Sequence, residues 1–248
     1  MKIDRAVLIT GGASGICKEV ALKMAKTHKT VVVLDKDQIA LDQLVKEADG
    51  HLIGIPCDLT IVNAVTDVIQ SLVKDGIKPT LLVNGVGGDA RRIPFAELNE
   101  NDLHYSLSQN LFTAFTVTRL LIPFMLEQQF GRIVNFSSVA GRTYTLFSNT
   151  AYVCAKSAIL GLTKQLAYEF AGNGITVNAV AHGPIQTQRI IAAWEQKTEA
   201  QRAAIIEQIP VGRLGTVAEA ADAIFYLCSE QAGYTTGSVL DCNGGMYI

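Results

Sequence analysis

The first 35 residues restrict the fold of this chain more than any other segment. An apolar run at residues 6–9 predicts a buried strand, which ends in the glycine-rich segment 10–17, TGGASGIC. A helical pattern at residues 20–25 and a second apolar run at residues 30–34 follow. A strand, a glycine turn and a helix N-terminus in this order bind phosphate, because unpaired backbone N–H groups and the helix dipole point at a bound anion. The segment therefore predicts a β-α-β unit that binds a dinucleotide.

Asp35 ends the second predicted strand, twenty positions after Gly15. A dinucleotide-binding fold places at this point the carboxylate that binds the adenine ribose. The same carboxylate would repel the 2′-phosphate of NADP, and Ser14 rather than an arginine stands in the glycine segment. We therefore expect NAD(H), while Lys18 or Lys36 could still reach a phosphate and keep NADP(H) open. A solvated turn residue is the alternative interpretation of Asp35.

Strand-like and helical segments alternate along the whole chain. Its 248 residues suit one large α/β domain, residues 1–248, better than two small ones. The strand-like runs lie at residues 5–10, 30–35, 51–55, 80–84, 131–137, 174–180 and 238–241. Such alternation predicts a doubly wound, seven-stranded parallel sheet with helices on both faces.

Composition excludes several classes of protein. The net charge of −2 favours neither a nucleic-acid nor an anionic-membrane partner. No apolar run reaches the ~18 residues needed to cross a bilayer, and the first strand starts too early to leave room for a signal peptide. The five cysteines are odd in number, scattered, and without metal-ligand spacing. We expect no metal site, reduced thiols and a cytoplasmic location.

Tyr152 and Lys156 lie four positions apart in a segment rich in alanine and leucine. The segment predicts a helix, on which positions i and i+4 project from one face. A free phenol has a pKa of roughly 10, and a neighbouring ammonium favours the phenolate and lowers that pKa. The pair is thus a candidate for acid–base catalysis, although a half-buried tyrosine beside a solvated lysine is common in helices.

These features together resemble the short-chain dehydrogenase/reductase family over essentially the whole chain. Its glycine motif, Thr-Gly-x-x-x-Gly-x-Gly, is matched by Thr10, Gly11 and Gly15. Its catalytic tetrad is matched by Asn110, Ser138, Tyr152 and Lys156. The resemblance implies a single-domain Rossmann fold and an oxidoreductase that moves hydride between a nicotinamide and a carbonyl or secondary alcohol.

The resemblance also implies the cofactor site. Thr187 matches the residue that hydrogen-bonds the nicotinamide carboxamide. Asp58 fits the position near the adenine, unless it only caps a helix that begins around Thr60. The expected cofactor-binding residues are Thr10, Gly11, Ser14, Gly15, Ile16, Asp35, Asp58, Leu59, Asn84, Gly85, Tyr152, Lys156, Gly183, Ile185 and Thr187.

The resemblance assigns roles to the tetrad in carbonyl reduction. Ser138 and Tyr152 donate hydrogen bonds to the carbonyl oxygen, and Tyr152 delivers the proton. Lys156 lowers the tyrosine pKa and holds the nicotinamide ribose, while Asn110 supports a water that resupplies protons. Taken singly, Asn110 could be an ordinary helix residue and Ser138 an ordinary strand-end residue.

Three positions depart from the family pattern. Cys17 replaces the last glycine of the nucleotide motif, which normally permits close packing of helix against strand, so we expect a slight shift there. Gly85 removes a side chain that usually ties strands together after the fourth strand. His182 replaces the proline after the sixth strand; a structural role is expected, with a proton relay as the alternative.

The C-terminal segment 208–248 is similar to that of bacterial 3-oxoacyl-thioester reductases. Reductases that act on acyl carrier protein usually carry arginines where this chain has Gln129 and Asn173. The resemblance therefore favours a coenzyme A thioester or another small 3-oxo compound. Arg91 and Arg92, after the fourth strand, could contact a phosphate or lie in a solvated loop.

Residues 188–208 combine an apolar and an amphipathic run and are the expected substrate lid, although they could simply pack on the core. Two alternative functions stay open. One is an NAD-dependent secondary-alcohol, polyol or steroid dehydrogenase; the other is a non-catalytic nucleotide-binding regulatory protein, for which the three departures would be typical. Members of the family usually form homotetramers through the long helices that carry Asn110 and Tyr152, and the apolar faces here allow this assembly.

Overall fold

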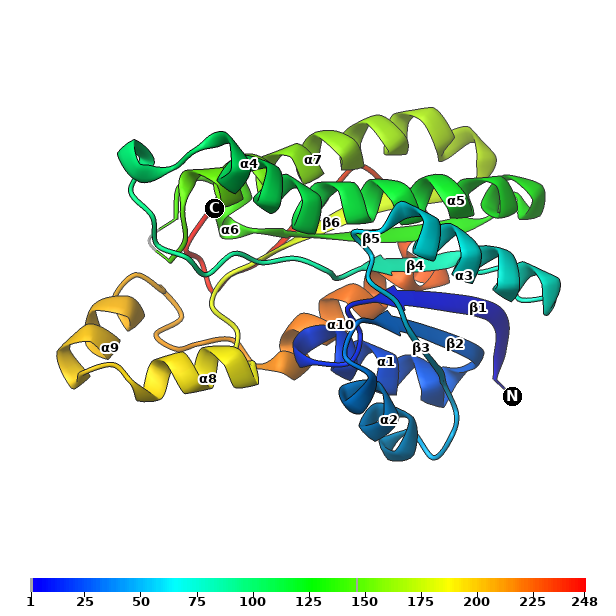
Figure 1. Cartoon of the computed structure of the whole chain (residues 1–248), viewed down its shortest axis with the longest axis horizontal. Helices are drawn as coiled ribbons and strands as arrows, with labels where there is room; N and C mark the ends of the chain where they lie inside the picture. Colours follow the sequence, from blue (N-terminus) through cyan, green and yellow to red (C-terminus); the bar gives the residue numbers. More distant parts are fainter. Residues whose placement is uncertain (1, 146) are drawn as a thin grey trace.

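The computed structural model describes residues 2–145 and 147–248, so the predicted domain range of 1–248 includes two positions, Met1 and Leu146, that lie outside the described residues. Seven strands form one parallel sheet in the order β3-β2-β1-β4-β5-β6-β7 (Figure 1). They are β1 (Ile3–Thr10), β2 (His28–Asp35), β3 (Ile53–Pro56), β4 (Leu81–Asn84), β5 (Gly131–Ser138), β6 (Ile175–His182) and β7 (Val239–Cys242). The predicted seven-stranded parallel sheet is confirmed.

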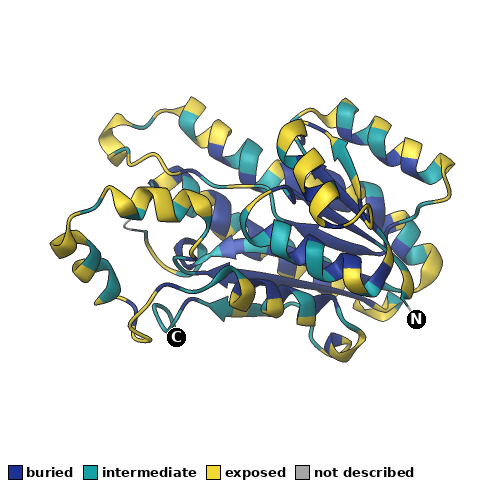
Figure 2. Ribbon diagram, turned by 90° about the horizontal axis from the view of Figure 1, so that it is seen from below, coloured by how far each residue is buried: buried dark blue, intermediate teal, exposed yellow. Residues whose placement is uncertain are grey.

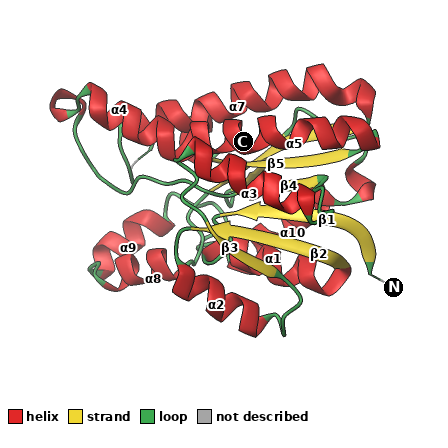
Figure 3. Ribbon diagram, turned by 45° about the vertical axis from the view of Figure 1, so that its right-hand side comes forward, coloured by secondary structure: helices red, strands yellow, loops and turns green. Residues whose placement is uncertain are grey.

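Helices cover both faces of this sheet. Figure 1 shows α1, α2 and α10 on one side and α3, α5 and α7 on the other, and Figure 3 shows the same layers from a turned view. The helices are α1 (Gly15–Thr27), α2 (Gln38–Glu47), α3 (Val62–Lys74), α4 (Glu100–Leu107), α5 (Thr113–Gln128), α6 (Val139–Arg142), α7 (Thr150–Phe170), α8 (Gln188–Glu195), α9 (Glu199–Ile206) and α10 (Val217–Cys228). Short 3₁₀ turns are η1 (Phe95–Glu97), η3 (Ala171–Asn173) and η4 (Glu230–Ala232).

The central strands are apolar on both faces because each face is covered. Successive residues of β1 point to opposite sides of the sheet. Val7 belongs to the same buried cluster as Val20 of α1 and Ile224 of α10, whereas its neighbour Leu8 belongs to the cluster on the other face with Leu121 of α5. This two-sided burial explains why the strands read in the sequence as short continuous apolar runs.

α4 and α5 form one long helix interrupted by a π-helical turn, η2 (Ser108–Phe112). A capping box of Asn99 and Asp102 begins α4. Asn110 lies in the π turn and is buried. Such turns are rare and often occur at functional sites, because they redirect the side chains of one turn.

The strand order reverses between β1 and β4, and ligands bind at the carboxyl ends of the strands at such a point. α8 and α9 project beyond these strand ends (Figure 1), and neither contains a buried residue. Figure 2 shows the buried residues gathered in the strands and the helix faces against them. In the described part of the chain, no helix is long and apolar enough to cross a membrane.

Candidate active site

A cleft of about 970 Å³ opens at the carboxyl ends of the central strands. Its walls come from the glycine segment, the ends of β2, β4, β5 and β6, the start of α7, and α8. The predicted site residues that line it are Gly11, Ser14, Gly15, Ile16, Asp35, Asp58, Leu59, Gly85, Ser138, Tyr152, Lys156, Gly183, Ile185 and Thr187. The structure thus brings the glycine segment, the carboxylate of Asp35 and the Tyr-Lys pair to one cleft.

The glycine segment has a backbone that side chains would obstruct. Gly11 and Gly15 adopt φ values of 65° and 56°, which residues with side chains rarely adopt. A Cβ on Gly11 would lie 3.0 Å from Val86 Cγ2, and one on Gly15 would lie 3.3 Å from Thr187 Cγ2. This open backbone before the N-terminus of α1 fits the pyrophosphate of a dinucleotide, because the helix dipole and free N–H groups favour an anion there.

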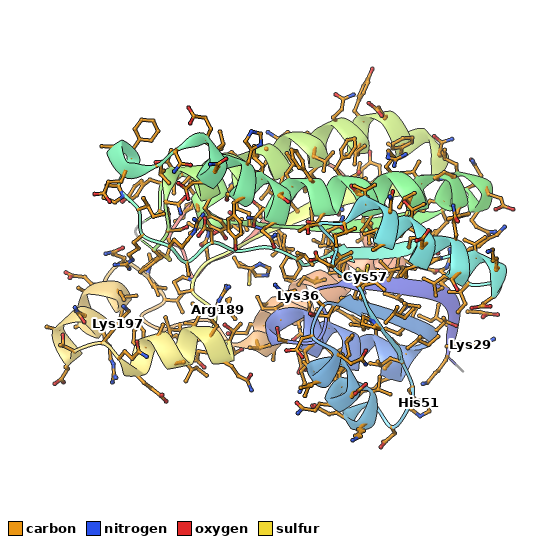
Figure 4. The ribbon with its side chains drawn as sticks, in the orientation of Figure 1. Lys29, Lys36, His51, Cys57, Arg189 and Lys197 are labelled. Atoms are coloured by element: carbon orange, nitrogen blue, oxygen red, sulfur yellow. The ribbon has the colours of Figure 1, made fainter. Side chains whose placement is uncertain are left out.

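Asp35 ends β2 with its carboxylate turned towards the glycine segment. Its Oδ2 accepts a hydrogen bond from the Ala13 N–H at 3.1 Å, and its Oδ1 accepts one from the N–H two residues later at 3.2 Å. Of the two lysines that could bind a 2′-phosphate, Lys36 lines the cleft at the end of β2 (Figure 4). Lys18 instead forms a 2.5 Å ion pair with Glu47 and is not part of the cleft wall.

Asp58 lies exposed at the adenine end predicted for the cleft. It accepts hydrogen bonds from the Thr60 hydroxyl at 2.7 Å and from the Thr60 N–H at 2.9 Å. These two bonds lower the pKa of the Asp58 carboxyl below its usual value. α3 begins at Val62 after the N-cap residue Ile61, so Asp58 stabilises the preceding turn and does not cap the helix.

Tyr152 and Lys156 lie in the first turns of α7. Asn149 caps this helix by accepting a hydrogen bond from the Tyr152 N–H at 3.1 Å. Lys156 is 3% exposed, and its Nζ donates a 2.7 Å hydrogen bond to the Phe136 carbonyl of β5. Burial lowers the pKa of Lys156 to about 7, since desolvation disfavours the ammonium. A lysine with this pKa exchanges protons near neutrality.

The pKa of Tyr152 differs from the expectation. Burial raises it above its ordinary value, and the Ser138 side chain and the charge of Arg189 oppose this effect only in part. Lys156 Nζ lies 5.7 Å from the centre of the Tyr152 ring and is directed at the Phe136 carbonyl. The prediction that Lys156 lowers the pKa of Tyr152 is therefore wrong. The phenol is held in its protonated form, which is the form that can donate a proton.

Three predicted site residues lie behind the cleft wall. Asn110 Oδ1 accepts a 2.8 Å hydrogen bond from the Gly88 N–H. Thr10 Oγ1 accepts a hydrogen bond from the Gly85 N–H at 3.1 Å. The side-chain amide of Asn84 donates a hydrogen bond to Asn135 Oδ1 of β5 at 2.8 Å. Both side chains are buried in these bonds, so the structure gives Thr10 and Asn84 a supporting position behind the cleft wall, and their part in cofactor binding stays a prediction.

Ser138 and Asn110 are both oriented by backbone groups. Ser138 Oγ accepts a 3.1 Å hydrogen bond from the Ala140 N–H at the start of α6, which leaves the hydroxyl proton free. Asn110 is close to Lys156, with only Gly87 between them. A Cβ on Gly87 would collide with Asn110 Oδ1 and lie 3.0 Å from Lys156 Nζ, so this position requires glycine.

Cys17 and Gly85, two of the departures from the family pattern, are complementary in space. Cys17 is 3% exposed and belongs to the core between α1 and the sheet. A Cβ on Gly85 would collide with Cys17 Sγ and lie 2.8 Å from the Thr10 carbonyl oxygen. The thiol therefore occupies the space that a side chain at position 85 would need. Burial, and to a lesser extent the charge of Asp35, raise the pKa of Cys17 well above its ordinary value, so this thiol is unreactive.

His182, the third departure, ends β6 on the cleft wall, opposite Ser138 in the β5–β6 register. Its ring centre lies 4.9 Å from that of Phe136. Burial, with a smaller effect of the Lys156 charge, lowers the pKa of His182 to about 3, and its Nε2 has no hydrogen-bond partner within the described residues. A neutral and weakly basic imidazole is unsuited to a proton relay, which favours the structural interpretation.

Comparisons with known proteins agree with this architecture. A family model described as Enoyl-(Acyl carrier protein) reductase matches residues 11–247. A 3-oxoacyl-[acyl-carrier-protein] reductase from Thermotoga maritima is 36% identical over 252 residues, which cover 100% of each chain. The chain belongs to the short-chain dehydrogenase/reductase family.

Other members of the family are similar over nearly the whole chain. An acetoacetyl-CoA reductase from Rhizobium meliloti is 36% identical over 251 residues, 99% of this chain and 100% of the relative. A crystal structure of a 3-oxoacyl-[acyl-carrier protein] reductase with bound NAD from Brucella melitensis superposes with a TM-score of 0.86 at 32% identity, covering 98% of this chain and 91% of the other. As a short-chain dehydrogenase/reductase, the protein is an oxidoreductase that acts on carbonyl or alcohol groups with a nicotinamide cofactor.

Among the cleft residues that no sequence motif indicated in this short-chain dehydrogenase/reductase is Arg189 of α8. Arg91 and Arg92 were considered from the sequence as a pair, and the structure separates them. Arg91 binds Asp89 at 2.8 Å and Asp102 at 2.7 Å, whereas Arg92 lines the cleft. No family motif contains these arginines, and their surroundings depend on how α8 and the loop after β4 pack, so only the structure could distinguish them.

Proposed function

We propose that the protein is an NAD(H)-dependent oxidoreductase that reduces a small 3-oxo compound, of the kind present in 3-oxoacyl thioesters, or oxidises the corresponding alcohol. The observation that carries this proposal is the presence of Ser138, Tyr152 and Lys156 on the same cleft as the glycine segment and Asp35. The relative from Rhizobium meliloti, named acetoacetyl-CoA reductase, supports 3-oxo chemistry.

We assign the nucleotide to the half of the cleft that contains the glycine segment. The backbone at Ser14, Gly15 and Ile16 would hold the pyrophosphate, and Asp35 would accept hydrogen bonds from the adenine ribose hydroxyls. Lys18 is paired with Glu47 and is therefore not free to bind a 2′-phosphate, which supports NAD(H) over NADP(H). When bound, the nicotinamide supplies or accepts the hydride.

Ser138 and Tyr152 polarise the substrate carbonyl. Ser138 Oγ already accepts a hydrogen bond from the Ala140 N–H, so its own proton is available to the substrate oxygen. Tyr152 donates a second hydrogen bond to the same oxygen. As negative charge grows on that oxygen, the phenol gives up its proton, which its raised pKa has kept in place until then.

Lys156 restores the proton to Tyr152. Its pKa of about 7 lets it gain and lose a proton near neutrality, and the Phe136 carbonyl holds its Nζ in position. Asn110 Oδ1 and Lys156 Nζ lie on either side of Gly87, which supports the role of Asn110 in a proton supply through this lysine. In the direction of alcohol oxidation the same groups act in reverse.

The Tyr152→Phe variant tests the proposal. We expect kcat for the reduction of acetoacetyl-CoA by NADH to fall roughly 10²–10⁴-fold, because the general acid is lost. NADH binding, followed by nucleotide fluorescence, should be unchanged, since the variant removes only the hydroxyl. Full activity of this variant would overturn the assignment of Tyr152. No activity of the wild-type protein on 3-oxo compounds would overturn the reaction itself.

A second candidate is an NAD-dependent secondary-alcohol, polyol or steroid dehydrogenase. It is favoured by the apolar α8 and α9 residues that line the cleft, Ile190, Ala193, Trp194 and Ile205. A panel of such alcohols with NAD⁺ distinguishes the two candidates.

The regulatory-protein alternative is not retained for a member of an oxidoreductase family. The single domain of residues 1–248, the lid role of residues 188–208, a homotetramer and a cytoplasmic location remain predictions.

A further inference from the structure

The substrate half of the cleft contains an arginine that crosses it. Arg189 is the second residue of α8 and belongs to the cleft wall. A Cβ on Gly88 would lie 3.0 Å from Arg189 Nη1, so the guanidinium reaches from α8 to the loop after β4. Its charge acts on both Tyr152 and Lys156. Figure 4 shows Arg189 on the side of α8 that borders the cleft.

This guanidinium is unpaired. Among residues 2–145 and 147–248, no carboxylate forms an ion pair with Arg189 and no acceptor forms a hydrogen bond with it. Arg91, which lies nearby in the loop after β4, shows the opposite arrangement, because Asp89 and Asp102 both bind it. A charged group held in a cleft without a counter-ion is available to an anionic ligand.

The surrounding charges reinforce this positive end. Arg92 and Lys197 also line the cleft, and the Arg92 guanidinium lies over the Phe147 ring at 5.7 Å rather than beside a carboxylate. Of the three cleft carboxylates, Asp35 and Asp58 lie at the other, nucleotide end, and Asp89 is neutralised by its ion pair with Arg91. The substrate end therefore carries a net positive charge that attracts anions.

The cofactor pyrophosphate does not explain Arg189. The glycine segment that fits the pyrophosphate adjoins Thr187, which lies against Gly15. Arg189 instead lies against Gly88 and borders a smaller hollow of about 350 Å³ that is lined by Gly88, Asp89, Ala90, Arg91 and Tyr105 and contains no residue of the glycine segment. Arg189 thus belongs to the substrate half of the site.

We propose that the substrate is a small oxo acid, or the matching hydroxy acid, whose carboxylate is bound by Arg189 while its carbonyl oxygen lies at Ser138 and Tyr152. This inference rests on the proposed function. In reduction the carbonyl carbon gains the hydride of NADH and its oxygen gains the proton of Tyr152, while the carboxylate is unchanged. A coenzyme A thioester fits less well, because its phosphates lie at the end of a long arm and the groups beside its reacting carbonyl are neutral.

The test compares acetoacetate, its neutral methyl ester and acetoacetyl-CoA as substrates with NADH. For the wild-type protein we expect the highest kcat/KM with acetoacetate. In Arg189→Gln, kcat/KM for acetoacetate should fall roughly 10–100-fold, mainly through KM, because a hydrogen-bonded ion pair is lost. The methyl ester should be little affected, and Arg189→Lys should be intermediate, since lysine keeps the charge but not the planar fork. Lys46→Gln, in α2, controls for the loss of one positive charge.

Equal losses for acid and ester in Arg189→Gln, or a wild-type preference for the ester or the thioester, would overturn the inference. A second readout does not need turnover: acetoacetate should raise the Tm of the wild-type complex with NADH and should not raise that of Arg189→Gln. Turnover of none of the three compounds would count against the proposed 3-oxo chemistry, and the Tm comparison would still decide the role of Arg189. An equal Tm increase in both proteins would overturn that role.

Discussion

At the scale of single residues, the contact between Cys17 and Gly85 makes two unusual residues depend on each other. We expect Gly85→Ala to lower the free energy of unfolding by roughly 1–3 kcal/mol, because the new Cβ would collide with Cys17 Sγ. The same substitution in a Cys17→Gly background should cost less. The rescue should be incomplete, since the Thr10 carbonyl oxygen would still lie 2.8 Å from that Cβ.

Urea unfolding of the wild-type protein, both single variants and the double variant gives the coupling energy directly. A value of about 0.5–3 kcal/mol is expected for two residues in contact. Additive effects of the two substitutions would contradict the proposed sharing of space. Cys228→Ala, at another buried cysteine in the same core, is the matched control for the loss of a buried thiol.

At the scale of elements, we expect the unit of β1, α1 and β2 to determine the choice of cofactor. Wild-type protein should bind NADH more tightly than NADPH in fluorescence titrations, because Asp35 would repel a 2′-phosphate. Asp35→Asn keeps the shape of the side chain and should weaken NADH binding roughly 10–100-fold, since hydrogen bonds to a charged acceptor are lost. Lys36→Gln is the companion variant. A wild-type preference for NADPH that disappears in Lys36→Gln would show that Lys36 outweighs Asp35.

Elements with a strong local pattern could be predicted from the sequence, and those that depend on distant partners could not. All seven strands were predictable; the five inner ones were so because burial makes each an apolar run, whereas the edge strands β3 and β7 contain no buried residue. The π turn at Asn110 was not, because Asn110 is held there by the backbone of Gly88, a residue of another element. The site follows the same division. The Tyr-Lys spacing indicated the helix that carries the proposed catalytic pair, whereas Arg189 could be placed only once the position of α8 against the cleft was known.

At the scale of the whole molecule, the buried Lys156 makes stability depend on pH. Its pKa is about 7 in the folded protein and roughly 10.4 in an unfolded chain. Between these values the unfolded state binds more protons, so stability rises with pH, and below them the cost of burying the ammonium is fully present. Lys156→Met should therefore stabilise the protein more at about pH 6.5 than at about pH 9.5.

The measurement is the free energy of unfolding at both pH values and at one protein concentration, so that any assembly affects the two conditions equally. Lys46→Met, at an exposed lysine of α2, is the control for the loss of one lysine. A stability difference between Lys156→Met and wild type that is the same at both pH values would contradict the assignment. The sign is decisive, because a lysine stabilised by an acidic partner would give the opposite trend.

The shared space of Cys17 and Gly85 also restricts the history of this chain. An ancestor with a side chain at position 85 and glycine at position 17 could not acquire the thiol first, because the two groups would overlap. The side chain at position 85 must be lost first, through an intermediate with glycine at both positions and a small void in the core, which is a tolerable defect. The reverse route would have to remove the thiol before restoring the side chain. Geometry thus favours one order of the two mutations, because the thiol at position 17 and a side chain at position 85 cannot be combined without a clash.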